Sequence, residues 1–333
     1  MELENQPTNC NDPPPVALFD ASHGQLNWAQ TGFPSRELHT NFAGLTESLC
    51  RLGFLCRSTK GEPLVSHLAH SRLLIIPSPT GRYDPRRERW RRERRSLFTD
   101  QEVQAVLRFL HQGGRLLAFA YRFGDSFTQT NLNALCRPLD CQLNDDAVLD
   151  LCTLRQTHPL QLHFDTTFDC LPPVWARHGV NSVRWRPSAT FTLQAGTPTW
   201  PLALSAGGCC LSFDRTRHRV HCEALPVAVV GQRGAGRFAL FGGPHLFESN
   251  ALGLLPEADN RRFLHNVLHW LLKDTSAPSV PMSLGGALSL PSLHPELTCL
   301  EGRAERARAV AWLERLLRQT GVWKALSRAK WSP

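Results

Sequence analysis

Short apolar runs that alternate with amphipathic segments constrain the fold of this chain more than any other feature. Val16–Phe19, Leu73–Ile76 and Leu116–Ala120 are uninterrupted apolar runs of strand length. Apolar residues at helical spacing fill the two intervals between them, over 41–53 and 99–112. Thr99-Asp-Gln-Glu102 has the pattern of a capping box and predicts the start of the second helix. Continuous apolar runs of this length are typical of strands buried on both faces. The alternation therefore predicts an α/β fold, with a mostly parallel sheet and helices on both of its faces.

The later part of the chain is less regular. The apolar runs 226–230 and 237–241 flank a glycine-rich segment, which indicates a hairpin. A helix is expected to begin at Asp259-Asn260, because apolar residues from Phe263 to Leu271 share one helical face. Scattered tryptophan, proline and histidine residues between 153 and 225 predict insertions and short strands.

Composition changes near both ends of the chain predict four segments. Residues 1–14 are polar and proline-rich and are expected to form a disordered leader, followed by one α/β domain over 15–274. Residues 275–298 are rich in Ser, Pro, Gly and Leu and lack a helical or strand period, as is typical of a linker. Residues 299–333 are expected to form an amphipathic helical tail.

The cysteine content and the N-terminal segment bear on the compartment. The chain has 11 cysteines in 333 residues but no Cys-x-x-Cys pair, and its first residues lack the apolar core of a signal peptide. We therefore expect a cytoplasmic protein with reduced thiols, no zinc site and no cofactor. The apolar runs are too short to cross a bilayer, so no membrane span is expected.

Positive charge is concentrated in two places. Residues 82–95 hold eight arginines against three acids, and residues 301–333 hold eight Lys or Arg against three glutamates. The first segment, with Trp90 inside it, suits a solvated loop, a dock for an acidic protein or a nucleic-acid contact. Its candidate contact residues are Arg91, Arg92, Arg94 and Arg95. The tail is expected to bind a protein partner through Leu313, Leu317 and Trp323.

The segment from Thr128 to Val148 carries a family resemblance. It contains the pair Asn131 and Asn133, a short apolar helix and then Leu-Asn-Asp-Asp-Ala-Val. In this order it resembles the GIFT domain, an amidotransferase-like module of bacterial gliding and transport components and of an intraflagellar transport subunit. Further anchors follow in the family's order, with Gly113-Gly114 before this segment and Phe241-Gly-Gly-Pro-His245 after it. The resemblance implies a flavodoxin-like, amidotransferase-like sheet over about residues 14–274.

The resemblance also bears on catalysis. Class I glutamine amidotransferases place a nucleophilic cysteine at a sharp strand-to-helix turn and activate it with a histidine held by an acid. Here the strand ending at Ala120 is followed by Tyr121-Arg122, and no cysteine stands at the turn. His245 and Glu248 fall where the amidotransferase histidine and glutamate would stand. We therefore expect no glutaminase activity.

Polar residues follow several predicted strands and define a candidate ligand site. Because ligands of parallel sheets bind at the carboxyl ends of the strands, a small polar ligand could be held there. The candidate ligand-binding residues are Asp20, His23, Gln25, Tyr121, Arg122, Asn131 and His245. The alternative is that these groups only satisfy local hydrogen bonds, since polar strand ends need them whatever the function. Asp20 would then cap a loop, His23 and Gln25 would bond to backbone groups, Arg122 would pair with Asp125, and Asn131 and Asn133 would cap the helix near Leu132.

Three hypotheses about function follow from these features. The first is a non-enzymatic binding or scaffold protein that recognises a protein partner or a small polar ligand within a larger assembly. The second is an acid–base enzyme that acts on a sugar-like substrate through Asp20 and His23. The third is nucleic-acid binding through Arg82–Arg95, which predicts a steep dependence of affinity on salt.

Overall fold

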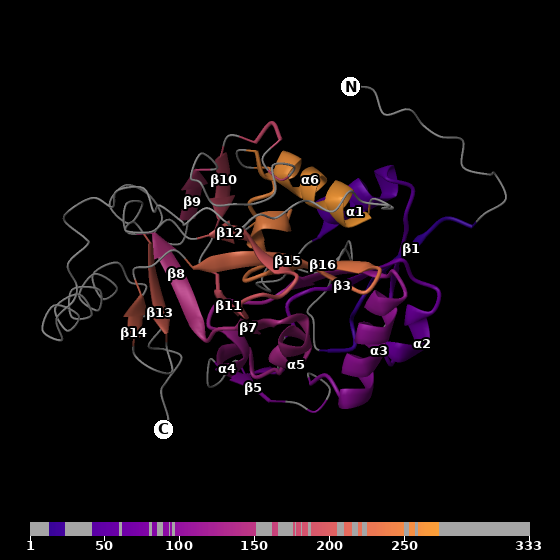
Figure 1. Ribbon diagram of the computed structural model, residues 1–333, viewed down its shortest axis with the longest axis horizontal. Helices are drawn as coiled ribbons and strands as arrows, with labels where there is room; N and C mark the ends of the chain where they lie inside the picture. Colours follow the sequence, from indigo (N-terminus) through magenta and orange to yellow (C-terminus); the bar gives the residue numbers. More distant parts are fainter. Residues whose placement is uncertain are drawn as a thin grey trace, which may run out of the picture.

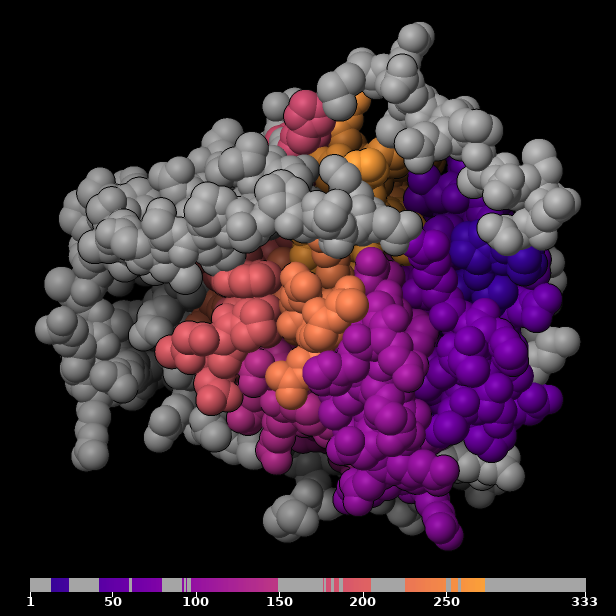
Figure 2. Space-filling view, turned by 45° about the vertical axis from the view of Figure 1, so that its right-hand side comes forward, coloured from indigo at the N-terminus to yellow at the C-terminus, as the bar shows by residue number. Residues whose placement is uncertain are grey.

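The computed structural model describes the central part of the chain. The described residues are 13–23, 42–59, 62–79, 82–84, 89–92, 94, 97–150, 162–165, 176, 178–180, 182–185, 188–204, 210–214, 219–221, 225–249, 253–256 and 259–272. Figure 2 shows that early (indigo), middle (magenta) and late (orange) parts of this range pack side by side. The expected linker over 275–298 and tail over 299–333 lie outside the described residues, as does the leader except for its last two residues.

A seven-stranded mixed sheet forms the centre of the molecule (Figure 1). Its order is β12 (Thr199–Leu204), β15 (Pro226–Arg233), β16 (Gly236–Phe241), β6 (Arg115–Phe119), β3 (Leu73–Ile76), β1 (Val16–Phe19) and β2 (Leu55–Ser58). The strands from β16 to β2 are parallel, and β15 and β12 add antiparallel pairs. The mostly parallel α/β fold predicted from the sequence is therefore confirmed.

Helices cover both faces of the sheet (Figure 1). On one face α1 (Ala43–Arg51) and α6 (Asn260–Leu272) bury their apolar sides against the strands. On the other face lie α2 (Val65–Leu68), α3 (Asp100–His111) and α5 (Asn133–Cys136). Because helices shield both faces, central strands such as β3 and β6 are buried at every position, which explains their apolar sequences apart from Arg115 at the start of β6.

The expected hairpin is present. β15 and β16 pair antiparallel from Ala228–Phe241 to Arg233–Gly236, and the turn between them uses Gly234 with a φ of 59°. Gly242 directly follows β16, where a Cβ atom would overlap the carbonyl of Ala189. The glycine at this position therefore allows two backbone segments to approach each other closely.

Smaller elements surround the main sheet. Four small sheets join β7 (Cys141–Leu143) with β11 (Phe191–Leu193), β9 (Leu162–Asp165) with β10 (Ser182–Trp185), β8 (Asp146–Asp150) with β13 (Cys210–Asp214) and β14 (Arg219–His221), and β4 (Arg82–Asp84) with β5 (Arg89–Arg91). The remaining helical turns are α4 (Gly124–Thr128), η2 (Arg137–Leu139) and η4 (His245–Phe247). The short strands expected between 153 and 225 are thus observed.

The sequence did not predict β2, the strand at one edge of the sheet. Its residues alternate between exposed and half-buried positions, and Leu55 is 40% exposed. An edge strand with one protected side does not need a continuous apolar run, so its sequence lacks the signal that identified β1, β3 and β6.

Candidate functional site at the carboxyl edge of the sheet

Polar side chains gather where β1, β3, β6 and β16 end. The chain moves from β1 outward to β2 and then back to β3 on the other side of β1, so the direction of winding reverses between β1 and β3. In parallel sheets this reversal opens the usual ligand position beyond the strand ends. Asp20 follows β1 and Ser78 follows β3, whereas Tyr121 follows β6 and His245 follows β16.

Asp20 and His23 bind each other directly after β1. The Nδ1 atom of His23 lies 2.7 Å from Oδ2 of Asp20, and both residues are buried, with exposures of 2% and 0%. Oδ1 of Asp20 accepts hydrogen bonds from the backbone N–H of Ser22 at 2.9 Å and from its hydroxyl at 2.6 Å. Both carboxylate oxygens therefore have partners within three residues, in agreement with the loop-capping alternative for Asp20.

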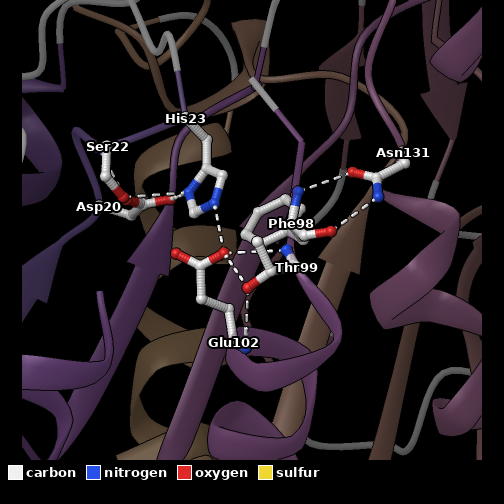
Figure 3. A network of polar contacts seen from close by, with 7 residues as sticks. All are labelled: Asp20, Ser22, His23, Phe98, Thr99, Glu102 and Asn131. Atoms are coloured by element: carbon white, nitrogen blue, oxygen red, sulfur yellow. Dashed lines mark hydrogen bonds and ion pairs between the residues drawn. The ribbon is translucent and has the colours of Figure 1, made fainter. Parts of the chain in front are cut away.

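His23 also connects β1 to the beginning of α3 (Figure 3). Its Nε2 atom lies 3.5 Å from Oε2 of Glu102, and its ring stacks on Phe98 at a centroid distance of 3.8 Å. Glu102 forms the predicted capping box with Thr99, because its carboxylate accepts from the Thr99 backbone N–H and the Thr99 hydroxyl accepts from the Glu102 N–H. The imidazole thus lies between two carboxylates and above an aromatic ring.

The electrostatics of this network favour the charged forms of both partners. Burial by itself lowers the pKa of His23, but the hydrogen bond and charge of Asp20, aided by Glu102, leave that pKa raised above its ordinary value. Burial raises the pKa of Asp20, but its bond to His23 outweighs this effect and leaves the pKa of Asp20 lowered. Both shifts in pKa favour the charged form of each partner.

Asn131 holds backbone atoms rather than facing a ligand. Its Oδ1 atom accepts from the Phe98 N–H at 2.8 Å, and its Nδ2 atom donates to the Phe98 carbonyl at 2.9 Å (Figure 3). Asn133 makes the same two-way contact with Leu143, at 2.8 and 2.9 Å. The two asparagines of the family-like segment are therefore clamps between neighbouring chain segments.

Asp125 takes the capping role that the sequence assigned to Asn131. Its carboxylate accepts from the backbone N–H groups of Leu132 and Asn133 at 2.7 and 2.9 Å, and from the Thr130 hydroxyl. The helix-capping interpretation of Asn131 is thus wrong, as is the expected pair between Arg122 and Asp125. A carboxylate can accept hydrogen bonds from several N–H groups at once. It therefore satisfies the free backbone N–H groups at this helix start better than one amide oxygen would.

The turn after β6 carries aromatic and cationic side chains. The Tyr121 ring stacks on Phe127 at 6.1 Å, and the Arg122 guanidinium lies over the Tyr121 ring at 5.5 Å. The next residue, Phe123, has a φ of 63°, a left-handed conformation that a large side chain seldom adopts. The chain thus turns sharply at the place where the amidotransferase resemblance puts a nucleophile, and Tyr121 and Arg122 occupy it.

His245 and Glu248 form a second polar pair on the short helix after β16. Their Nδ1 and Oε2 atoms lie 2.6 Å apart, with Glu248 almost fully buried and the His245 side chain 14% exposed. The His245 ring meets the Tyr121 ring edge-on at 5.8 Å. β6 and β3 both lie between β16 and β1, so this pair and the Asp20–His23 pair follow strands about 14 Å apart.

The remaining candidates are placed as follows. Gln25, Arg95 and the tail residues Leu313, Leu317 and Trp323 lie outside the described residues. Arg92 and Arg94 are exposed, and Arg91 ends β5. The Asp146 carboxylate accepts from the Thr190 N–H at 2.7 Å and from the Thr190 hydroxyl at 2.6 Å. Within the described part of the chain, no group of three or more His, Cys, Asp or Glu side chains is arranged to hold a metal ion.

Comparison with known proteins identifies the fold. No protein-family model matches the chain, and no curated protein matches it. Among solved structures, the mmIFT52 N-terminal domain is 20% identical with a TM-score of 0.58, and the match covers 77% of this chain and 97% of that one. The two chains share a fold. A ThuA-like protein from Bacteroides uniformis ATCC 8492 is 13% identical with a TM-score of 0.43, and the match covers 82% of this chain and 98% of that one.

Among the described residues, no helix is both long and apolar enough to cross a bilayer.

Proposed function

We propose that this chain is a non-enzymatic binding or scaffold protein, built on a degenerate amidotransferase-like domain of the GIFT type. The observation that carries the proposal is the Asp20–His23–Glu102 network, in which Asp20 and His23 are buried. The two groups best suited to acid–base chemistry are buried, and each is hydrogen-bonded to the other. A general acid or base must reach the substrate within hydrogen-bond distance, which a side chain with an exposure of 0–2% does not do.

The turn after β6 supports the same proposal. Tyr121 and Arg122 stand there, and neither is an activated nucleophile of the kind that acyl transfer requires. His245 with Glu248 keeps the form of a base held by an acid, but it faces the Tyr121 ring. The acid–base alternative on a sugar-like substrate is therefore not favoured.

The shared fold suggests the setting in which such a domain works. The chain has the fold of the mmIFT52 N-terminal domain, and the sequence resemblance pointed to the module found in an intraflagellar transport subunit. On that basis the domain contributes a rigid α/β body to a larger assembly. The C-terminal tail and the exposed arginines near β5 supply contacts with protein partners.

A direct assay tests the absence of catalysis. The full chain is incubated with glutamine and, separately, with a p-nitrophenyl ester, beside a His245→Ala variant as the matched control. We expect no turnover above the uncatalysed rate and no difference between the two proteins. Turnover that disappears in the His245→Ala variant would contradict the proposal, because it would show a working base at the strand ends.

A further inference from the structure

The face of α6 that points away from the core carries two histidines one helical turn apart. His265 and His269 are both exposed. Their rings are nearly parallel, with an interplanar angle of 8° and a distance of 6.4 Å between the ring centroids. Residues four positions apart lie on the same face of a helix, with Cβ atoms roughly 5–6 Å from each other. The two imidazoles are therefore neighbours on the surface of the molecule.

The opposite side of α6 holds this pair in place. The helix lies against one face of the main sheet (Figure 1). Its buried residues in the core on this face are Phe263, Leu264, Val267, Leu268 and Leu271. Because a close-packed apolar side resists rotation and sliding of the helix, the backbone positions of the two histidines are fixed.

Hydrogen bonds beside the pair tie the same surface to a neighbouring segment. The Nδ2 atom of Asn266 donates to the carbonyls of Ala176 and His178, at 3.1 and 3.0 Å. The Nη1 atom of Arg262 donates to the Gly179 carbonyl at 3.1 Å. These bonds direct the side chains of Asn266 and Arg262 toward that segment and leave the two histidines as neighbours.

We propose that His265 and His269 together bind a divalent transition metal ion of the zinc type on the exposed face of α6. Imidazole nitrogens suit zinc, copper and nickel. Two histidines at positions i and i+4 of a helix are an arrangement that binds zinc in proteins. The sequence-based expectation of no zinc site came from the spacing of cysteines, which does not bear on this pair. The binding does not depend on the proposed non-enzymatic function.

The separation of the rings is compatible with one shared ion. Zinc binds histidine nitrogens at about 2.0–2.1 Å, so the two ligand nitrogens must lie within about 4 Å of each other. Rings whose centroids are 6.4 Å apart reach this separation by an inward rotation about the side-chain bonds. Exposed side chains change rotamer within nanoseconds, so this rotation requires no movement of the helix.

The pair supplies two of the four ligands that zinc usually takes. Within the part of the chain that the structure describes, no third His, Cys, Asp or Glu side chain completes a metal-binding group with them. Water or a side chain of another protein then fills the other positions. Structural zinc sites use four protein ligands and contribute to folding. A site with two protein ligands is therefore expected to exchange its ion freely and to leave the fold intact when empty.

Positive charge near the pair weakens this binding without preventing it. Arg261 is exposed and stands one turn before His265. Its repulsion of a bound cation is small, because water and salt screen charges on the surface. The bonds from the two imidazole nitrogens to the ion act at short range and are not screened in this way.

Isothermal titration calorimetry of the full chain tests the proposal with zinc chloride as the probe. The chain has 14 histidines, so the measured quantity is the change in zinc stoichiometry and affinity between variants. We expect His265→Ala and His269→Ala each to remove the same one equivalent of zinc or to weaken its binding at least tenfold. Calcium chloride should show no binding at this pair, because calcium prefers oxygen ligands. Zinc binding that is identical in the natural protein and both variants would overturn the proposal.

Two further variants separate the pair from general binding by surface histidines. His70→Ala removes an exposed histidine after α2, on the other face of the sheet, and should keep the zinc equivalent. His269→Cys replaces one zinc ligand by another and should keep it as well. Because the exchanged side chains are exposed, all variants should unfold at about the temperature of the natural protein without metal. Loss of the equivalent in His70→Ala, or equal binding of calcium, would reject the histidine pair as the site.

Discussion

At the scale of single residues, we expect the stability of the carboxyl edge of the main sheet to depend most on His23. It bonds to Asp20, faces Glu102 and stacks on Phe98, with an exposure of 2%. Replacement by alanine leaves the Asp20 carboxylate buried without its cationic partner. Removing one partner of a buried ion pair typically costs about 3 kcal/mol or more, and we expect a loss of that size in the free energy of unfolding. Urea denaturation of both proteins measures it.

The same pair predicts how that loss depends on pH. The pKa of His23 is raised in the folded state. Its contribution to the free energy of unfolding is therefore complete below the pKa of His23 in the unfolded chain, and it disappears as pH rises through the pKa of the folded state. The pKa of Asp20 is lowered in the folded state. Its contribution to the free energy of unfolding is therefore present above the pKa of Asp20 in the unfolded chain, and it disappears as pH falls through the pKa of the folded state. The stability difference between the natural protein and His23→Gln should therefore be largest between about pH 4 and 6.5 and shrink at alkaline pH. A difference that stays constant with pH would show that the pair is not ionised.

The sequence identified several of these residues but not their partners. Asp20 and His23 were selected because they follow a buried strand, and Glu102 was recognised only as half of a capping box. Their meeting depends on the loop after β1 lying close to the start of α3, and these segments are far apart in the sequence. Local spacing reveals a cap or a strand end, whereas a contact across the sheet becomes visible only once the strand order is known.

At the scale of elements, the Asn131 clamp connects α5 to the start of α3. It satisfies both the N–H and the carbonyl of Phe98, which Asn131→Ala would leave without these partners. Unsatisfied backbone groups of this kind cost about 1–3 kcal/mol, so we expect a lower melting temperature. Asn131→Asp, the matched control, keeps the acceptor and loses the donor, and it should be intermediate. Unchanged thermal unfolding in both variants would show that the clamp does not contribute to stability.

The way each helix or strand is buried determines whether its sequence pattern predicted it. Central strands such as β3 and β6 are enclosed on both faces and have continuous apolar sequences, so they were predicted. The capping box of α3 and the hairpin of β15 with β16 have local signatures and were predicted too. The edge strand β2 has no such pattern. The start of α5 was misassigned because Asp125, which satisfies it, lies seven residues before Leu132.

At the scale of the whole molecule, the described α/β body has a closed core on both faces of its sheet. The last described helix, α6, already buries Phe263, Leu264, Val267, Leu268 and Leu271 against α1 and the strands. We therefore expect that deleting residues 301–333 leaves the melting temperature nearly unchanged. The deleted segment has a net charge of +5, and its sequence predicts a helix with an apolar face that includes Leu313 and Leu317. Such a helix gains most of its stability by packing against a surface.

The same deletion should therefore abolish an association while the fold persists. Calorimetry measures the first effect, and analytical ultracentrifugation of the full and shortened chains with and without a candidate assembly partner measures the second. The matched control is a full-length chain with Leu313→Ser and Leu317→Ser, which retains the tail's charge and loses its apolar face. If the apolar face makes the contact, this variant should lose the association as the deletion does, whereas retained association would assign the contact to charge. Aggregation of the shortened chain on its own would show instead that the tail completes the core.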